Sequence, residues 1–72
     1  MSNYHLIKIT PEKYKRMETF SAESLEAAIE YHINPKHHRN YRIALFMRTP
    51  TGNRYTLQDS LDIRAGRRLA HD

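Results

Sequence analysis

The stretch SAESLEAAIEYHI, residues 21–33, sets the architecture that we expect for this chain. It predicts an amphipathic helix with Ser21 as the N-cap, since a serine oxygen can accept hydrogen bonds from the free amides of the first turn. Asn34-Pro35 is its expected end. One side of the helix is apolar and the other is acidic. The apolar stripe consists of Leu25, Ala28, Ile29, His32 and Ile33, and the acidic side of Glu23, Glu26 and Glu30.

Two segments with alternating side chains precede this helix. Residues 4–10 read as a strand, and residues 14–20 as a second, weaker strand. The sequence Thr10-Pro11-Glu12-Lys13 separates them as a turn, because proline cannot continue a hydrogen-bonded ladder.

A hairpin is expected after the helix, with strands at residues 41–48 and 54–58 and a five-residue loop at 49–53. If Arg48 faces Arg54, then Met47 lies opposite Tyr55 and Leu45 opposite Leu57. The side that packs on the helix then holds Ile43, Leu45, Met47, Tyr55 and Leu57. The other side holds Arg42, Ala44, Phe46, Arg48, Arg54 and Thr56.

Residues 59–72 have two interpretations. Leu61 and Ile63 fit an added strand, whereas Ser60 fits the cap of a short helix with Leu61, Ala65 and Leu69 on one side. Because Gly66 inside that helix would cost about 1 kcal/mol relative to alanine, we expect an edge strand. Residues 64–72 then form a frayed basic tail.

These elements predict a single α+β domain over residues 1–72. Its antiparallel sheet of four to five strands packs on one α-helix in the order β-β-α-β-β. A chain this short buries only about 60% of its unfolded surface, so the core is single and small. One helix covers one face of such a sheet, and the other face stays open. We expect function on that open face.

Composition excludes several protein classes. The absence of cysteine rules out a disulfide scaffold and a Cys-based zinc module. No apolar run approaches the roughly 18 residues of a membrane span, and the N-terminus has no signal-peptide pattern. We therefore expect no membrane partner and a cytoplasmic location, which is the host cytoplasm if the protein is viral.

Charge is distributed unevenly along the chain. The net charge of +4 divides into −1 for residues 1–30 and +5 for residues 31–72, and residues 31–58 contain no acidic residue. Asymmetry of this kind indicates an acidic partner such as nucleic acid or an acidic protein surface. A solvated basic face that keeps the protein soluble is the alternative.

The candidate binding residues fall into two groups. Phe46 lies among arginines on the open face, where its ring can stack on a base while guanidinium groups hold phosphates. A basic loop follows the helix at residues 36–42. The predicted binding residues are Lys36, Arg39, Tyr41, Arg42, Phe46, Arg48 and Arg54. Alternatively, Phe46 packs under Tyr41 or the C-terminal tail, and the arginines extend into water.

Catalytic and metal-binding patterns are weak. His32, His37 and His38 lack cysteine and nearby carboxylate partners other than Glu30, so we expect no metal and no other cofactor. The two glycines form no phosphate loop. His5 and His71 receive no role. The sequence therefore predicts a protein that is not an enzyme.

One resemblance adds a specific expectation. The run Leu6-Ile7-Lys8-Ile9, the helix start at residues 22–28 and a Tyr/Arg-rich hairpin resemble small phage-encoded proteins. These include anti-CRISPR inhibitors of type I systems, in which a curved antiparallel sheet wraps one helix. The resemblance covers residues 4–58 and implies a non-enzymatic blocker of a nucleic-acid-binding surface in a host complex. The positive charge departs from the acidic inhibitors that mimic DNA, and no functional residue is carried over.

Three classes of function follow. The first is an inhibitor that docks on a host nucleoprotein complex through the basic hairpin face and the 36–42 loop. The second is a stand-alone nucleic-acid binder or small regulator that uses Phe46 and its flanking arginines. The third is an enzyme with a clustered His/Arg/Tyr site. The open face also predicts a possible homodimer in which two sheets bury their Phe46 faces together.

Overall fold

A computed structural model describes residues 1–9, 15–38 and 44–69 of the chain. It shows an α+β fold with a four-stranded antiparallel sheet, in the strand order β2-β1-β3-β4. The α+β class and the four-stranded antiparallel sheet confirm the prediction, but the fold contains three helices instead of one, because α2 follows α1 and α3 follows the last strand. The elements are β1 (Ser2–Ile9), β2 (Lys15–Ala22), α1 (Leu25–Ile33), α2 (Pro35–His38), β3 (Ala44–Arg48), β4 (Arg54–Thr56) and α3 (Leu57–Arg64).

Strand β1 lies inside the sheet, with β2 on one side and β3 on the other. Its pairing with β2 runs from Ser2 opposite Ala22 to Ile9 opposite Lys15. Because side chains alternate along a strand, Tyr4 and Leu6 face one side of the sheet, and His5 and Ile7 face the other. The predicted turn at residues 10–13 and the first residues of the predicted third strand lie outside the described residues.

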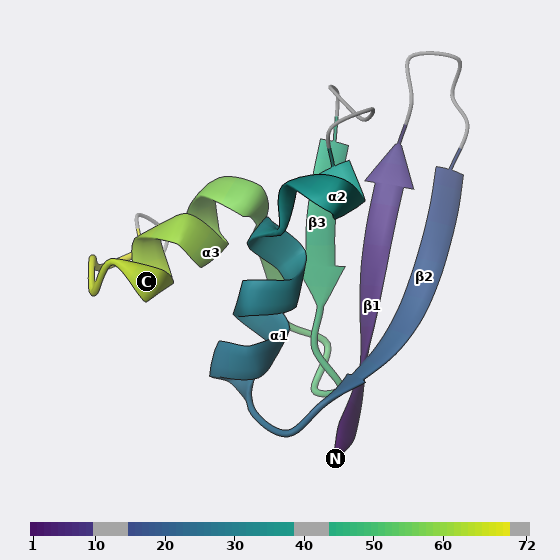
Figure 1. Ribbon diagram of the computed structural model, residues 1–72, viewed down its shortest axis with the longest axis horizontal. Coiled ribbons are helices and arrows are strands. Elements are labelled where there is room, and N and C mark those ends of the chain that lie inside the picture. Colours follow the sequence, from purple (N-terminus) through teal and green to yellow (C-terminus); the bar gives the residue numbers. More distant parts are fainter. Residues whose placement is uncertain (10–14, 39–43, 70–72) are drawn as a thin grey trace.

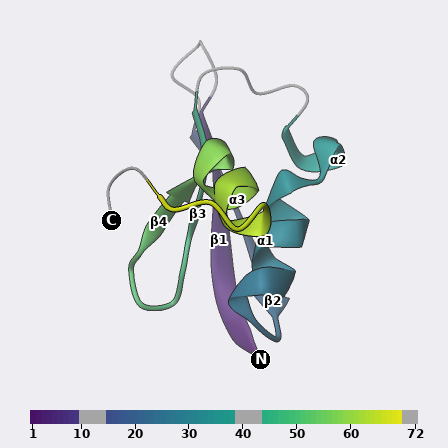
Figure 2. The ribbon, with the colours of Figure 1, turned by 90° about the vertical axis from the view of Figure 1, so that its left-hand side faces the viewer.

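The helices lie on the side of the sheet that carries Tyr4. Figure 1 shows α1 in front of the strands with α3 beside it, and Figure 2 shows α1 and α2 to one side of β1. None of the helices in the described ranges has the length and apolar character that crossing a membrane requires.

Helix α1 begins three residues later than the sequence predicts. Its N-cap is Ser24, whose hydroxyl accepts a hydrogen bond from the Ala27 amide at 3.2 Å. Ser21 still belongs to β2, and its hydroxyl donates to the Asn3 side chain at 2.9 Å. The Ser21 prediction was wrong because pairing with β1 extends β2 through Ala22. The predicted end is confirmed, since Asn34 is the C-cap.

The segment after β4 is a helix, so the predicted edge strand is wrong. Thr56 and Asp59 form a capping box, in which each side chain accepts a hydrogen bond from the other residue's backbone amide. Helix α3 also ends with a defined cap. The Gly66 amide donates to the Ile63 carbonyl, and the Arg67 amide donates to the Asp62 carbonyl.

Gly66 lies just past the end of α3 rather than inside it. Its φ of +76° is in the left-handed region, where glycine avoids the steric cost of a Cβ atom. The paired hydrogen bonds and the left-handed glycine together make a Schellman motif. In the interior of a helix Gly66 would be destabilising, but at this position it stabilises the end of α3.

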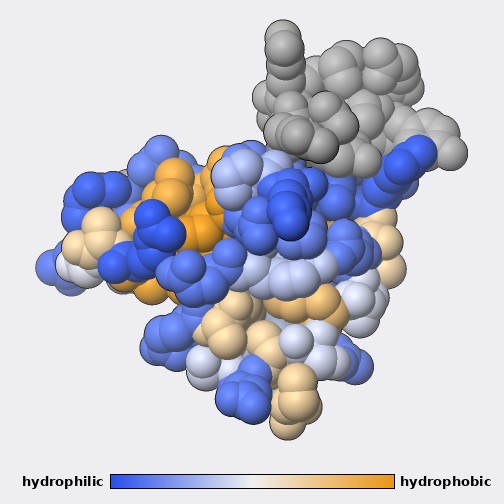
Figure 3. All heavy atoms as spheres, viewed as in Figure 1, coloured by the Kyte–Doolittle hydropathy of each residue, from blue (hydrophilic) through white to orange (hydrophobic). Residues whose placement is uncertain are grey.

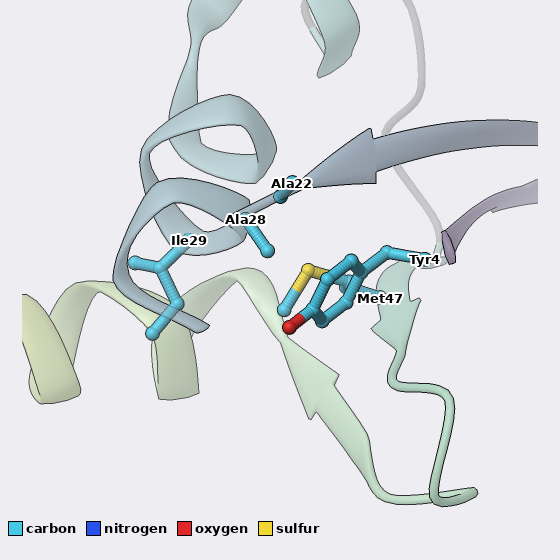
Figure 4. Packing of buried hydrophobic residues seen from close by; sticks show 5 residues of the cluster. All are labelled: Tyr4, Ala22, Ala28, Ile29 and Met47. Atoms are coloured by element: carbon cyan, nitrogen blue, oxygen red, sulfur yellow. The ribbon is translucent and has the colours of Figure 1, made fainter. Parts of the chain in front are cut away.

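The hydrophobic core lies between the sheet and the helix layer. Figure 4 shows side chains from β1, β3 and α1 meeting there, and α3 contributes Ile63 to the same cluster. The expected apolar stripe of α1 is buried at Ala28, Ile29 and His32. The buried members of the cluster are Tyr4, Ala22, Ala28, Ile29 and Met47. Helix α3 is therefore part of the folded unit.

Candidate functional site on the sheet face opposite the helices

The sheet face opposite the helices is the surface where the sequence predicts function. We call it the cationic face. Strand alternation and the observed register assign its described residues. They are Asn3, His5, Ile7 and Ile9 of β1, Lys15, Met17, Thr19 and Ser21 of β2, Phe46 and Arg48 of β3, and Arg54 and Thr56 of β4.

The described carboxylates are confined to one side of the molecule. The cationic face holds three permanent cations, Lys15, Arg48 and Arg54, and no acidic residue among its described positions. The described carboxylates are on the helix-facing side of β2, in the bend before α1, or in α1 and α3. They are Glu18, Glu23, Glu26, Glu30, Asp59 and Asp62. The cationic face therefore carries a local excess of positive charge.

Ion pairs follow the same division. Lys8 contacts Glu18 at 3.3 Å, Arg64 contacts Glu30 at 3.7 Å, and Arg67 contacts Asp62 at 2.8 Å. All three pairs lie on the helix side or in the segment that follows α3. Within residues 1–9, 15–38 and 44–69, no carboxylate pairs with the arginines of the cationic face.

Two of those arginines lie directly opposite each other. Arg48 pairs with Arg54 across β3 and β4, and Met47 pairs with Tyr55, as the hairpin analysis predicts. The predicted pair of Leu45 with Leu57 is wrong, because Leu57 begins α3. Like charges at directly opposed positions destabilise a sheet. An anion bound between the two guanidinium groups would offset that repulsion.

The arginine pair belongs to a row that crosses the whole sheet. Thr19 pairs with His5, His5 pairs with Arg48, and Arg48 pairs with Arg54. Nδ1 of His5 lies 3.1 Å from the Thr19 hydroxyl. His5 and Thr19 were not among the predicted binding residues, although the alternation of residues 4–10 places His5 on the face opposite Tyr4 and Leu6.

Phe46 is on the predicted face but is not an open stacking platform. The residue is only 6% exposed, and its cross-strand neighbour Ile7 is 2% exposed. The Arg54 guanidinium lies 3.9 Å from the centre of the Phe46 ring. A base could stack on that side of the ring only after Arg54 moved away. Phe46 thus contacts the Arg54 guanidinium, and its stacking on a base stays a prediction.

Of the remaining predicted binding residues, Lys36 belongs to the described part of the chain and lies away from this face. Lys36 is exposed in α2, which follows α1 in the helix layer, and its amide donates to the Asn34 side chain. The structure therefore separates Lys36 from the arginine pair. Arg39, Tyr41 and Arg42 lie outside the described residues, as does the predicted packing of Phe46 under Tyr41.

A stack of four rings occupies the helix side. Tyr4, Phe20, Tyr31 and His37 follow one another with ring centroids 5.7, 3.9 and 4.1 Å apart. The Tyr31 hydroxyl donates to Glu18. Burial and this hydrogen bond raise the pKa of Tyr31 to about 12, and the same bond is the main cause of a lowered pKa at Glu18. The stack ties β1 and β2 to α1 and α2.

The three histidines near the end of α1 have separate environments. His37 stacks on Tyr31, His38 contacts the Ile33 carbonyl at 3.1 Å, and His32 is buried between helices. In the part of the chain that the structure describes, no group of three potential metal ligands is close enough to hold an ion.

A serine and a histidine meet inside the helix layer. Nδ1 of His32 is 2.7 Å from the Ser60 hydroxyl, and both residues are fully buried. Burial is the main cause that lowers the pKa of His32 to about 4. A substrate cannot reach a hydroxyl that is withdrawn from solvent, so this geometry fits a polar contact between α1 and α3.

A shallow groove lies where α1 and α3 meet. It is lined by Glu26, Ile29, Glu30, Ile63 and Arg64. Figure 3, which views the helix side, has its strongest apolar patch toward the α3 end of the molecule. The Glu30–Arg64 ion pair bridges the two helices at this groove.

Comparison with protein-family models, with curated proteins and with solved structures found no significant match.

Proposed function

We propose that this protein is a small non-enzymatic binding protein that docks through its cationic face onto the phosphates of nucleic acid. The observation that carries the proposal is the distribution of carboxylates. The described residues of this face include three permanent cations and no carboxylate, while the described carboxylates gather on the helix side. A surface of this kind attracts polyanions, because it has no negative side chains that would repel them.

The chemistry of the face favours contact with the backbone rather than with bases. Arg48 and Arg54 are exposed and have no described acidic partner, so their guanidinium groups are available for phosphate oxygens. Phe46, the aromatic residue expected to stack on bases, is buried beneath Arg54. Phosphate contacts position a protein on nucleic acid without reading its sequence.

The narrower form of the proposal is an inhibitor in the host cytoplasm. In that form the cationic face docks on a host nucleic-acid-handling complex, as the resemblance to phage-encoded inhibitors implies. A stand-alone nucleic-acid binder is the second candidate, favoured by the exposed Arg48–Arg54 pair. Tight binding to a nucleoprotein with weak binding to free oligonucleotides distinguishes the inhibitor from the stand-alone binder.

A homodimer through the cationic face stays a prediction. Phe46, which such a dimer was expected to bury, is already buried in the single chain, where only 6% of it is exposed. Met17 on the same face is 62% exposed. Burial of Met17 would therefore supply more of the apolar gain than burial of Phe46. Sedimentation over a range of concentrations tests this, and a monomer at all concentrations contradicts it.

The decisive experiment is fluorescence anisotropy with labelled single-stranded and duplex oligonucleotides at several salt concentrations. We expect affinity to fall steeply as salt rises, because each neutralised phosphate releases counterions. The double variant Arg48→Gln/Arg54→Gln should lower the slope of log K against log salt by about 2.

A matched control separates a specific face from total charge. Arg64→Gln/Arg67→Gln removes the same charge from arginines that pair with Glu30 and Asp62. Equal losses in the two double variants would show that net charge alone drives binding. Absence of binding at low salt, with a folded wild-type chain, would contradict the proposal for free nucleic acid.

A further inference from the structure

We infer that His5, Arg48 and Arg54 form one discrete phosphate-binding site, which takes a single phosphodiester of the nucleic-acid backbone. The inference rests on the proposed function and deepens it, because it locates one contact within the broader cationic face. The three residues occupy consecutive positions in a row across β1, β3 and β4. Nothing in the helix layer contributes to this row.

The register brings the three side chains close together. His5 is directly opposite Arg48, and Arg48 is directly opposite Arg54. Neighbouring strands lie about 4.8 Å apart, so the row spans about 10 Å from β1 to β4. The long arginine side chains of β3 and β4 can converge with the His5 imidazole of β1 on one anion. A phosphate offers several oxygen acceptors, which suits several donors in one place.

Arg54 is held in position before any ligand arrives. Its guanidinium lies over the buried ring of Phe46, 3.9 Å from the ring centre. A guanidinium that stacks on a ring through its flat face keeps its N–H groups directed outward in the plane. Less side-chain freedom is then lost when an anion binds.

His5 is oriented by a hydrogen bond from the neighbouring strand. Its Nδ1 is 3.1 Å from the Thr19 hydroxyl on β2, the strand on the side away from Arg48. When that hydroxyl donates to Nδ1, the neutral imidazole carries its proton on Nε2. The Nε2–H group is then a third donor beside Arg48. Thr19 is thus a positioning residue for His5.

The absence of a competing carboxylate completes the site. Among the described residues, neither Arg48 nor Arg54 has an ion pair, and the cationic face holds no acidic side chain. The repulsion between the opposed arginines is relieved when an anion binds between them. Phosphate binding is therefore coupled to the stability of the β3–β4 hairpin.

The test uses inorganic phosphate as the probe and two-dimensional NMR of the 15N-labelled chain at constant ionic strength, with chloride as the reference anion. We expect saturable shifts at the amides of His5, Arg48 and Arg54 and at the His5 imidazole. Arg48→Gln should weaken phosphate affinity about tenfold. Arg64→Gln, on the helix side where Arg64 pairs with Glu30, should leave phosphate affinity unchanged.

Thr19→Val tests the positioning role by a separate readout. It should weaken phosphate affinity by a few-fold and change the imidazole 15N shifts of His5 toward a mixture of the two tautomers. A purely structural role of Thr19 would leave those shifts unchanged, and would overturn this part of the inference.

The results distinguish failure of the site from failure of the function. Oligonucleotide binding that loses as much affinity in Lys15→Gln as in Arg48→Gln, with no saturable phosphate shifts, would overturn the discrete site and keep the proposed function. Phosphate binding at the row without oligonucleotide binding would overturn the backbone phosphodiester as the ligand and the proposed function with it. Saturable shifts together with a selective loss in Arg48→Gln for both ligands support the site.

Discussion

The imidazole of His32 and the hydroxyl of Ser60 lie 2.7 Å apart in the interior of the helix layer, and they join α1 to α3. Both residues have no solvent exposure. Within the described residues, Nε2 of His32 has no hydrogen-bond partner. A polar group buried in this way stays neutral, because charging it would require removing water from a cation.

Acid should destabilise the protein through His32. Its pKa is about 4 in the folded chain and about 6.5 in an unfolded one. The unfolded chain therefore binds the proton more tightly, and stability falls as pH decreases from about 6.5 to 4. The full difference corresponds to about 3 kcal/mol. Urea unfolding at about pH 7.5, 6, 5 and 4, which covers this window, measures the loss of stability.

The control for this prediction is His32→Gln. The variant is less stable at neutral pH, because it disturbs a buried contact, but it lacks the titrating group. Its stability should therefore fall less between about pH 6.5 and 4 than that of the wild type. Parallel pH curves for the two proteins would contradict the assignment.

The end of α3 depends on the left-handed conformation of Gly66. Gly66→Ala should lower stability by about 1 kcal/mol. No atom lies within 4 Å of a Cβ at this position, so the cost is conformational and not steric crowding by neighbours. Gly66→Asn is the matched control, since asparagine tolerates this region better. Equal losses in the two variants, measured by thermal unfolding, would be inconsistent with this origin.

The N-cap of α1 can be located by a pair of serine variants. Ser24→Ala should lower stability by about 1 kcal/mol, because it removes the acceptor for the Ala27 amide. Ser21→Ala removes only an exposed hydrogen bond to Asn3 and should cost less. Urea unfolding with circular dichroism of the helix signal compares them. A larger loss of stability in Ser21→Ala than in Ser24→Ala would support Ser21 as the N-cap, as the sequence predicts.

Removal of one opposed arginine should stabilise the sheet in low salt. Arg48→Thr relieves the repulsion from Arg54 and should raise stability by about 0.5 kcal/mol. Arg54→Thr should gain less, since it also loses the contact with the Phe46 ring. Both gains should shrink in high salt as the charges are screened. If the effect of Arg48→Thr does not depend on salt, the higher strand propensity of threonine explains it, and not the removal of charge.

Tyr31 should ionise later than an ordinary tyrosine. Its pKa of about 12 reflects burial first and the hydrogen bond to Glu18 second. Because the folded value lies above the unfolded value of about 10, stability is lost as pH rises from about 10 to 12. Ultraviolet titration should show a late tyrosinate step that Tyr31→Phe removes. A titration identical in both proteins would show that another tyrosine is responsible.

Local patterns in the sequence predict much of the sheet and the first helix. Alternation identifies β1, the apolar stripe identifies the buried side of α1, and the hairpin analysis places Arg48 opposite Arg54. These features succeed because they depend on side-chain periodicity and on turn residues close in sequence. The start of α1 was misplaced, because the length of β2 is fixed by its partner strand and not by its own residues.

The C-terminal helix shows a different kind of error. The pattern Thr56-x-x-Asp59 is a capping signal that the strand interpretation overlooked. A helix was rejected because Gly66 was expected in its interior, whereas the helix ends just before Gly66. At the candidate site, the exposure of Phe46 was overestimated although the hairpin register was predicted correctly. The register places Arg54 near Phe46 but does not tell whether the arginine side chain folds over the ring.

The separation of carboxylates from the cationic face gives the molecule an electric dipole moment directed through the sheet. Its positive end lies at Lys15 of β2, Arg48 of β3 and Arg54 of β4, whereas the helix side carries charges of both signs, including the acids of α1 and α3. Near a polyanion, such a dipole experiences a torque that turns the sheet toward the surface before any contact forms. Fewer encounters are then wasted in the wrong orientation, so the association rate constant should depend on salt more strongly than the dissociation rate constant does.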